Sequence, residues 1–186
     1  MNNLREQIVG IDVPIQEIQI SLYNYLSERW AGTITGYGRV YKNRTSDGSV
    51  IPEWFDSNIG TSGGYKSVYY DDSTGSNFCF LVGDNDSSND GFVFTSNVKC
   101  VFAVNLDSLL SSSSNERLDS VVQRDAVEFL RDSDYNTFKI TGIQRTIENV
   151  YSGYSIENIQ ASGNIEPLHV FSVNFDLQYY LTDKCS

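Results

Sequence analysis

FSVNFDLQYY, residues 171–180, is the stretch of sequence that decides the fold. Apolar residues occupy every second position and polar residues or tyrosine stand between them; the apolar set is Phe171, Val173, Phe175, Leu177 and Tyr179. Successive side chains of a β-strand point to opposite faces of the sheet, so this period of two predicts a strand. One of its faces is expected in the core, and the other is expected to meet solvent or a partner.

Five further stretches rich in β-branched and aromatic residues predict strands, at residues 33–41, 65–70, 78–82, 98–106 and 137–149. The polar segment 71–77 is expected to join the second and third of these as a hairpin. The fourth stretch alternates well, with one apolar face made of Val98, Cys100, Phe102, Val104 and Leu106. Polar loops are predicted at residues 84–91 and, much longer, at 43–64 and 151–167.

Two segments show the spacing of an amphipathic helix. Residues 14–30 begin with a proline, which suits the first helical position, and carry an apolar stripe of Ile15, Ile18, Leu22, Tyr25 and Leu26. Residues 115–132 begin at a predicted capping box of Ser113 and Glu116, and their buried stripe is Leu118, Val121, Val122, Ala126, Phe129 and Leu130. The polar residues expected to face outward are Gln16, Gln19, Asn24 and Ser27 in the first helix and Asp119, Gln123, Arg124 and Glu128 in the second.

The order of these elements predicts an α+β fold, because helices and strands do not alternate as they do in βαβ units. We expect one domain over residues 1–186, with a mostly antiparallel sheet flanked on one face by two helices. The loops at 43–64 and 151–167 are interpreted as insertions that could serve as assembly arms.

Composition limits the classes of partner. The 186 residues carry 24 acidic and 13 basic side chains, a net charge of −11. Nucleic-acid binders need clustered Lys and Arg for phosphate contacts, so tight binding of DNA or RNA is not expected. The hydrophobic fraction of 40% is sufficient for a folded core.

Cysteine usage and hydropathy predict synthesis in a reducing cytoplasm. Cys79, Cys100 and Cys185 are an odd number of widely spaced residues, which does not fit a disulfide framework, and neither C-x-x-C nor a His/Cys cluster offers a zinc site. No signal peptide, membrane span, metal or cofactor is expected.

Several polar groups are candidates for chemical sites, and the sequence favours a structural role for each. The acidic loop with Asp84, Asp86 and Asp90 lacks the glycine and glutamate of a calcium-binding EF-hand, so a solvated turn is expected. His169 has no nucleophile motif to accompany it and is interpreted as a strand-edge residue. Gly36-Tyr37-Gly38 is followed by strand residues and not by a helix, which favours a β-bulge or close packing over a phosphate loop.

The apolar island Val50-Ile51-Pro52-Glu53-Trp54-Phe55 inside the long loop allows two interpretations. It could fold back over the sheet and complete the core, or Trp54 and Phe55 could insert into a neighbouring subunit, since Trp and Tyr dominate interface hot spots. On the second interpretation the predicted interface residues are Ile51, Trp54, Phe55, Tyr65, Tyr69, Tyr151 and Tyr154.

The layout resembles that of the tail-terminator and neck proteins of tailed bacteriophages. The stretches that carry the resemblance are residues 15–30, 78–82, 101–106 with the helix 117–130, and 170–180. The resemblance implies a structural virion protein without catalysis or cofactor, made in the host cytoplasm. It implies a closed ring, a hexamer or dodecamer, at the head–tail junction or the tail, with neighbouring neck, tail or portal proteins as partners. The genome would pass through the acidic lumen without specific binding.

Two other classes of function stay open from the residues. Exposed rings could stack on sugars or bind a protein, with Tyr37, Tyr41, Trp54, Tyr65, Tyr69 and Tyr70 as candidates. A hydrolase would need a carboxylate pair such as Glu53 with Asp56, held at a separation set by the reaction.

Overall fold

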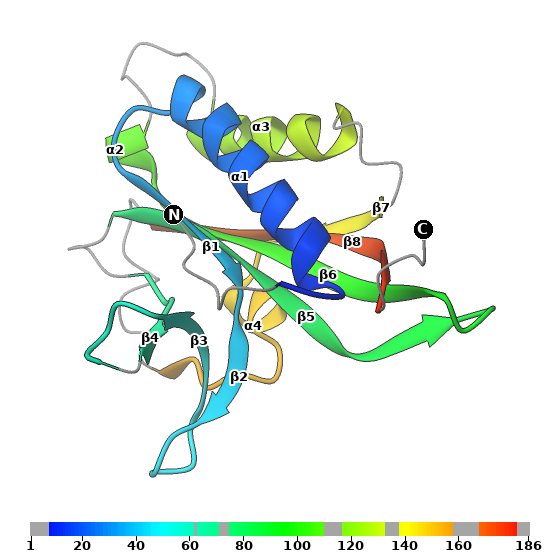
Figure 1. Cartoon of the computed structure of the whole chain (residues 1–186). Coiled ribbons are helices and arrows are strands. Elements are labelled where there is room, and N and C mark those ends of the chain that lie inside the picture. Colours follow the sequence, from blue (N-terminus) through cyan, green and yellow to red (C-terminus); the bar gives the residue numbers. More distant parts are fainter. Residues whose placement is uncertain are drawn as a thin grey trace.

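A computed structural model of the chain describes residues 8–61, 63–70, 75–109, 117–132, 138–157 and 168–181. Two helices, α1 (Asp12–Arg29) and α3 (Leu118–Asp132), lie on one face of a five-stranded sheet (Figure 1). They contact each other where the ring of Tyr25 packs on that of Phe129, with centroids 5.2 Å apart. The predicted α+β class, with both helices on one face of a mostly antiparallel sheet, is confirmed.

The main sheet has the strand order β1-β5-β6-β8-β7. Its strands are β1 (Ile34–Arg39), β5 (Ser76–Ser88), β6 (Val93–Asn105), β7 (Phe138–Gln144) and β8 (Leu168–Tyr180). All neighbours pair antiparallel except β1 and β5, which are parallel. The strand predicted at residues 171–180 lies within β8, and its five alternating apolar residues are all buried.

The helix-side core consists of the two apolar stripes packed on one face of the sheet. Phe102 of β6 and Phe171 of β8 stack in its centre with ring centroids 4.7 Å apart. The contributing residues include Ile15, Ile18, Leu22, Leu26, Val122, Ala126 and Leu130 from the helices and Phe78, Phe80, Val98, Cys100, Val173, Phe175 and Leu177 from the strands. Helical and strand periods in the sequence therefore identify this core correctly.

The outward orientation predicted for two glutamines is wrong. Gln19 is buried, and its Nε2 donates to the carbonyl oxygen of Gly36 at 2.7 Å. Gln123 is buried as well and contacts His169. A glutamine that borders the apolar stripe of a helix can reach sheet polar groups beneath it, and a buried polar group needs such a partner.

The segment predicted as a long loop at residues 43–64 forms most of a second sheet. Strands β2 (Tyr41–Arg44), β3 (Val50–Asp56) and β4 (Gly64–Ser67) pair antiparallel in the order β2-β3-β4. The expected turn chemistry is present between β2 and β3, where Gly48 has φ +89° and the Thr45 N–H donates to the Ser49 carbonyl at 2.8 Å. The polar residues of β2 and the proline within β3 interrupt the apolar–polar alternation by which strands are predicted, so these strands were not expected.

The hairpin predicted between residues 65–70 and 78–82 is wrong. β4 pairs with β3 of the second sheet, whereas β5 pairs with β1 on one side and β6 on the other. Residues 76–81 of β5 are buried at every position, which requires cover on both faces of the sheet. Such a strand lies in the middle of a sheet and cannot be one half of an exposed hairpin. Residues 71–74 of the predicted turn lie outside the described residues.

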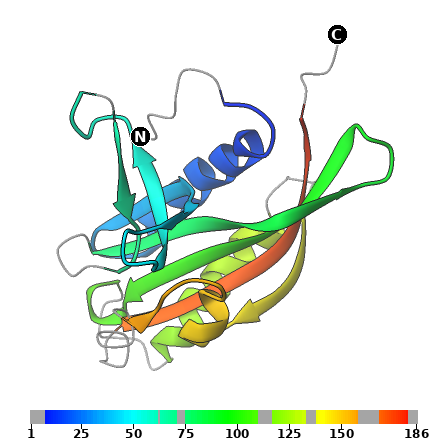
Figure 2. The same ribbon diagram turned by 90° about the horizontal axis from the view of Figure 1, so that it is seen from below.

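The polar loop predicted at residues 84–91 is also wrong, because strand pairing continues through most of it. Asp86 to Ser88 of β5 pair with Phe94 to Ser96 of β6, beyond a bulge after Val82. We call residues 83–94 the arm, since this hairpin extends past the ends of the helices (Figures 1 and 2). Residues 83–88 are exposed at every position, so this part of β5 lacks the apolar alternation by which strands are predicted.

The strand predicted at residues 137–149 is shorter than expected. It ends at Gln144, and α4 (Ile147–Val150) follows, with its apolar residues three apart and facing the sheet. The short helix α2 (Leu106–Leu109) likewise begins where the predicted strand 98–106 was to end. The predicted capping box at Ser113 and Glu116 and residues 158–167 of the predicted loop lie outside the described residues.

Candidate functional site

The second sheet packs against the face of the main sheet that is opposite the helices (Figure 2). Trp54 of β3 contacts Tyr37 of β1 with ring centroids 5.5 Å apart, and Pro52 beside it is buried. The indole Nε1 of Trp54 is buried and has no hydrogen-bond partner. Trp54 therefore completes the protein's own core, as the first interpretation of the apolar island required.

Residues 150–156 continue this inner layer. Tyr151 is 2% exposed and packs edge-on against Tyr69, with centroids 5.2 Å apart. The Tyr69 hydroxyl donates to the carbonyl oxygen of Ser155 at 2.7 Å. The Ser155 N–H donates to the Val50 carbonyl at 2.7 Å, which joins this segment to β3. Four of the seven predicted interface residues, Trp54, Tyr69, Tyr151 and Tyr154, thus belong to an internal cluster.

The other predicted interface residues lie on the outer face of the second sheet. Tyr65, 51% exposed, contacts Phe55 and Tyr41 through edge-on ring packing at 5.4 and 5.7 Å. Ile51 lies on the same face by the period of two in β3. We call this surface the outer aromatic face; it consists of the predicted interface residues Ile51, Phe55 and Tyr65 together with Tyr41, which was a candidate for sugar stacking.

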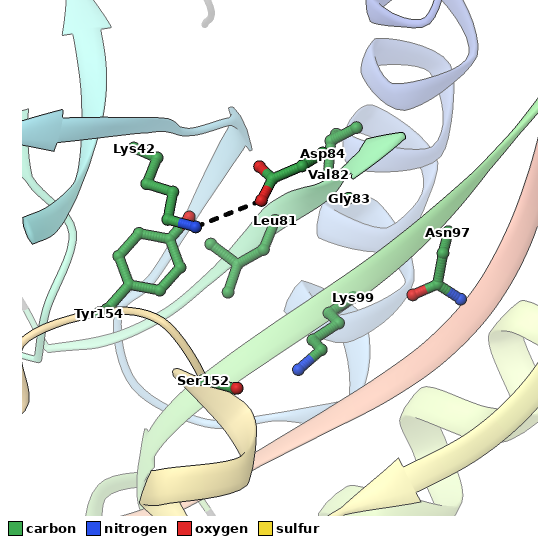
Figure 3. A pocket seen from close by; sticks show the side chains of 9 residues that line it. All are labelled: Lys42, Leu81, Val82, Gly83, Asp84, Asn97, Lys99, Ser152 and Tyr154. Carbon is green, nitrogen blue, oxygen red and sulfur yellow. Dashed lines mark hydrogen bonds and ion pairs between the residues drawn. The ribbon is translucent and has the colours of Figure 1, made fainter. Parts of the chain in front are cut away.

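The inner cluster also borders a shallow hollow of about 110 Å³ between the two sheets (Figure 3). Lys42 lies on one side of it with its Nζ 3.4 Å from the Asp84 carboxylate. Lys99 lies on the other side and donates to the Asn149 carbonyl at 2.9 Å, and partial burial lowers the pKa of its ammonium group. Burial raises the pKa of the Tyr154 hydroxyl to about 12, so this phenol stays protonated at neutral pH.

The hollow offers hydrogen-bond donors and positive charge, and it has one carboxylate, that of Asp84. Its two ammonium groups suit a small anion or the carboxylate of another chain. Among its lining residues this carboxylate faces Lys42, and no His or Cys is present. No group of three or more His, Cys, Asp or Glu that could hold a metal ion occurs in the ranges described.

The residues of the acidic loop are engaged in the arm itself. The Asp84 carboxylate faces Lys42, and the Asp86 carboxylate accepts from the Tyr179 hydroxyl at 2.5 Å. Asp90 accepts from the backbone N–H groups of Phe92 and Val93, and these bonds lower its pKa. Asp90 therefore fixes the turn at the tip of the arm.

His169 contacts two polar side chains at the edge of the helix-side core. Its Nε2 lies 2.9 Å from Nε2 of Gln123, and Oε1 of that glutamine accepts from Nε of Arg145 at 2.8 Å. Because Arg145 takes the amide oxygen, the amide nitrogen must donate to the ring, whose Nε2 is then unprotonated. Burial lowers the pKa of His169, which agrees with a neutral imidazole. This network was missed in the sequence because Gln123 was expected to face solvent.

The remaining candidates are placed as follows. Glu53 and Asp56 lie three residues apart in β3, so their side chains leave opposite faces and do not converge. The close packing expected at Gly36 is confirmed, since a β-carbon there would lie 2.6 Å from the Phe78 ring. Cys79 and Cys100 are buried, which raises the pKa of both thiols, and Cys185 lies outside the described residues.

None of the helices in the described ranges is long and apolar enough to cross a membrane. No protein-family model matches the chain, and no curated protein matches it in sequence.

Proposed function

We propose that this chain is a structural subunit of a tailed bacteriophage that assembles into a ring at the head–tail junction or in the tail, without catalysis. On this proposal the protein is made in the host cytoplasm and resides in the virion. It contacts copies of itself and adjacent neck, tail or portal proteins. The observation that carries the proposal is the arm, which leaves the body of the subunit and presents exposed surface to whatever lies next to it (Figure 1).

The physical reason is that the outer strand of the arm, residues 83–88, is an edge of the main sheet that its own subunit leaves uncovered on the side away from β6. All of residues 83–88 are exposed, and Phe92 at the tip is 73% exposed, the highest value among the large apolar residues described. On its inner side, β6 pairs with β8 as far as Val93 and Tyr180, so the open parts are the outer strand and the tip. An open strand edge and a large exposed apolar group both mark interaction sites. Contact with a neighbouring subunit would bury both.

Charge and chemistry support the same proposal. A net charge of −11 suits a ring whose lumen repels the phosphates of a passing genome. The candidate carboxylates Glu53 and Asp56 leave opposite faces of β3, so the pair considered for hydrolysis is not formed. The element order observed also agrees with the resemblance to tail-terminator and neck proteins, at the level of an N-terminal helix, a sheet, a second helix and closing strands.

The direct test is electron microscopy of the purified protein, combined with detection of the protein in virions with a specific antibody. We expect closed rings and a signal at the neck or tail. Phe92→Ser should weaken ring formation and leave the fold intact, whereas Ile20→Ser on α1, at 53% exposed, serves as the matched control for the loss of an exposed apolar residue. A protein that is strictly monomeric and absent from virions would refute the proposal.

The outer aromatic face favours one alternative, a module that binds carbohydrate or protein. Tyr41 and Tyr65 are exposed, and tyrosine rings stack on sugars and are common at interfaces. Saturable binding on a glycan array that is lost with Tyr65→Ala would promote this alternative. Tyr180→Ala, at an exposed tyrosine far along the chain in β8, is the matched control.

A further inference from the structure

The main sheet has two open edges in the part of the chain that the structure describes. On one side, β1 pairs with β5 only as far as Phe80, so residues 83–88 of β5 have β6 as their one neighbouring strand. On the other side, β7 pairs with β8 alone. Both edges belong to one sheet, and they lie at its opposite sides (Figure 1).

The two edges carry opposite charge. The arm contains Asp84, Asp86 and Asp90, and the sequence from residue 83 to residue 98 holds no Lys or Arg. The β7 edge and the residue after it contain Lys139 and Arg145 and no acidic residue. In a protein with nearly twice as many acidic as basic side chains, an edge strand whose one charged residue is a cation departs from the overall balance.

An unpaired strand edge is a template for pairing with another chain, because its outward N–H and C=O groups lack partners in the sheet. The open part of β5 and the seven residues of β7 are of similar length. A contact between them would satisfy backbone groups on both strands and bring the Asp carboxylates of the arm toward Lys139.

We propose that the outer strand of the arm in one copy adds to the β7 edge of the next copy, so that the main sheet continues from subunit to subunit. The inference rests on the proposed ring and identifies its contact. The two edges differ, so the contact is heterologous, and repeated head-to-tail contacts of that kind either close into a ring or grow into a filament. Phe92 adds exposed apolar area at the end of the same contact.

The charges that the contact needs are accessible. The Asp84 side chain is 77% exposed, and its distance of 3.4 Å to Lys42 is that of a weak surface pair. Lys139 is exposed on the strand edge. Either charge can therefore be reversed without disturbing the core.

The experiment measures assembly of the native chain, of Asp84→Lys and of Lys139→Glu by analytical ultracentrifugation and electron microscopy. Each reversal places like charges across the contact, and we expect each to raise the dissociation constant at least about tenfold. When the two variants are mixed, every contact again joins opposite charges, so rings with an even number of subunits should reappear. Glu17→Lys on α1 and Arg131→Glu on α3 are controls with the same changes in charge at exposed sites.

Circular dichroism and urea midpoints equal to those of the native chain establish that the variants are folded. If the native chain forms rings and either reversal leaves assembly unchanged, the edge contact is wrong and the proposed function stands. If both variants are monomeric and their mixture stays monomeric, the two edges do not meet. A native chain that remains monomeric at every concentration overturns the edge contact and the proposed ring together.

Discussion

Trp54→Ala separates the two roles that the sequence left open for this residue. The side chain is half-buried between the second sheet and Tyr37. Truncating a fully buried aromatic residue to Ala costs about 3–5 kcal/mol, so half that burial corresponds to about 2 kcal/mol. The lost ring pair adds about 1 kcal/mol. The buried indole N–H has no partner, and its removal offsets about 1 kcal/mol of that loss. The net expectation is a loss of about 2 kcal/mol in the free energy of unfolding.

The assay is urea unfolding of the purified protein. Unfolding is monitored by circular dichroism of the backbone, because tryptophan fluorescence would change with the substitution itself. For a chain of this size, about 2 kcal/mol lowers Tm by roughly 4–8 °C. Trp54→Phe keeps the ring contact and removes the unpartnered N–H, so its loss should stay below about 1 kcal/mol. Tyr65→Ala, on the exposed outer face, is the second control, and we expect a loss of about 1 kcal/mol or less.

An unchanged urea midpoint for Trp54→Ala, with the same dependence on denaturant, would refute this reasoning. That result would mean that the second sheet does not depend on Trp54 for its attachment. If ring formation were lost at the same time, Trp54 would be an anchor for a neighbouring subunit, as the other interpretation held.

Three further outcomes are expected. Trp30→Phe removes the N–H that donates to the buried Asp125 carboxylate at 2.9 Å. It should lower the free energy of unfolding by about 2 kcal/mol in urea titrations. An unaltered urea midpoint would mean that water replaces the lost donor. His169 has a pKa lowered in the folded state, so the unfolded chain binds more protons as the pH falls through about 6.5. Stability should therefore be full above that pH and decline below it, and this part of the decline should vanish in His169→Gln; a native profile identical to that of the variant would contradict it. Gly36→Ala forces a β-carbon against the Phe78 ring at 2.6 Å and should cost about 1–3 kcal/mol by thermal unfolding, while a neutral effect would show that the ring moves aside freely.

The sequence predicted the elements whose apolar faces lie against the helix-side core. β8 and the stripes of α1 and α3 repeat with periods of two and 3.6 because each has one buried face and one polar face. The arm and β2 escaped prediction for the complementary reason. Residues 83–88 of the arm are exposed at every position, and β2 has four mostly polar residues, so neither shows alternation.

The candidate site was predicted in part. The aromatic residues of the island at 50–55 and of the segment at 151–154 were identified as important, but their type did not reveal which face of which strand each occupies. Trp54 and Phe55 are adjacent in β3, and the strand period alone sends one toward Tyr37 and the other toward the outer face. Whether that strand existed could be decided only by its partners β2 and β4.

Local patterns therefore determined that this chain forms two amphipathic helices over a mostly antiparallel sheet, since burial of one face leaves its period in the sequence. Tertiary structure decided which strands are neighbours, that β4 joins a second sheet and that β5 continues into the arm. Those choices come from backbone hydrogen bonds between residues far apart in the chain, and such bonds are the same for every residue type except proline, which lacks the N–H donor. They leave no mark on composition or spacing, although they set the open edges from which the proposed ring would be built.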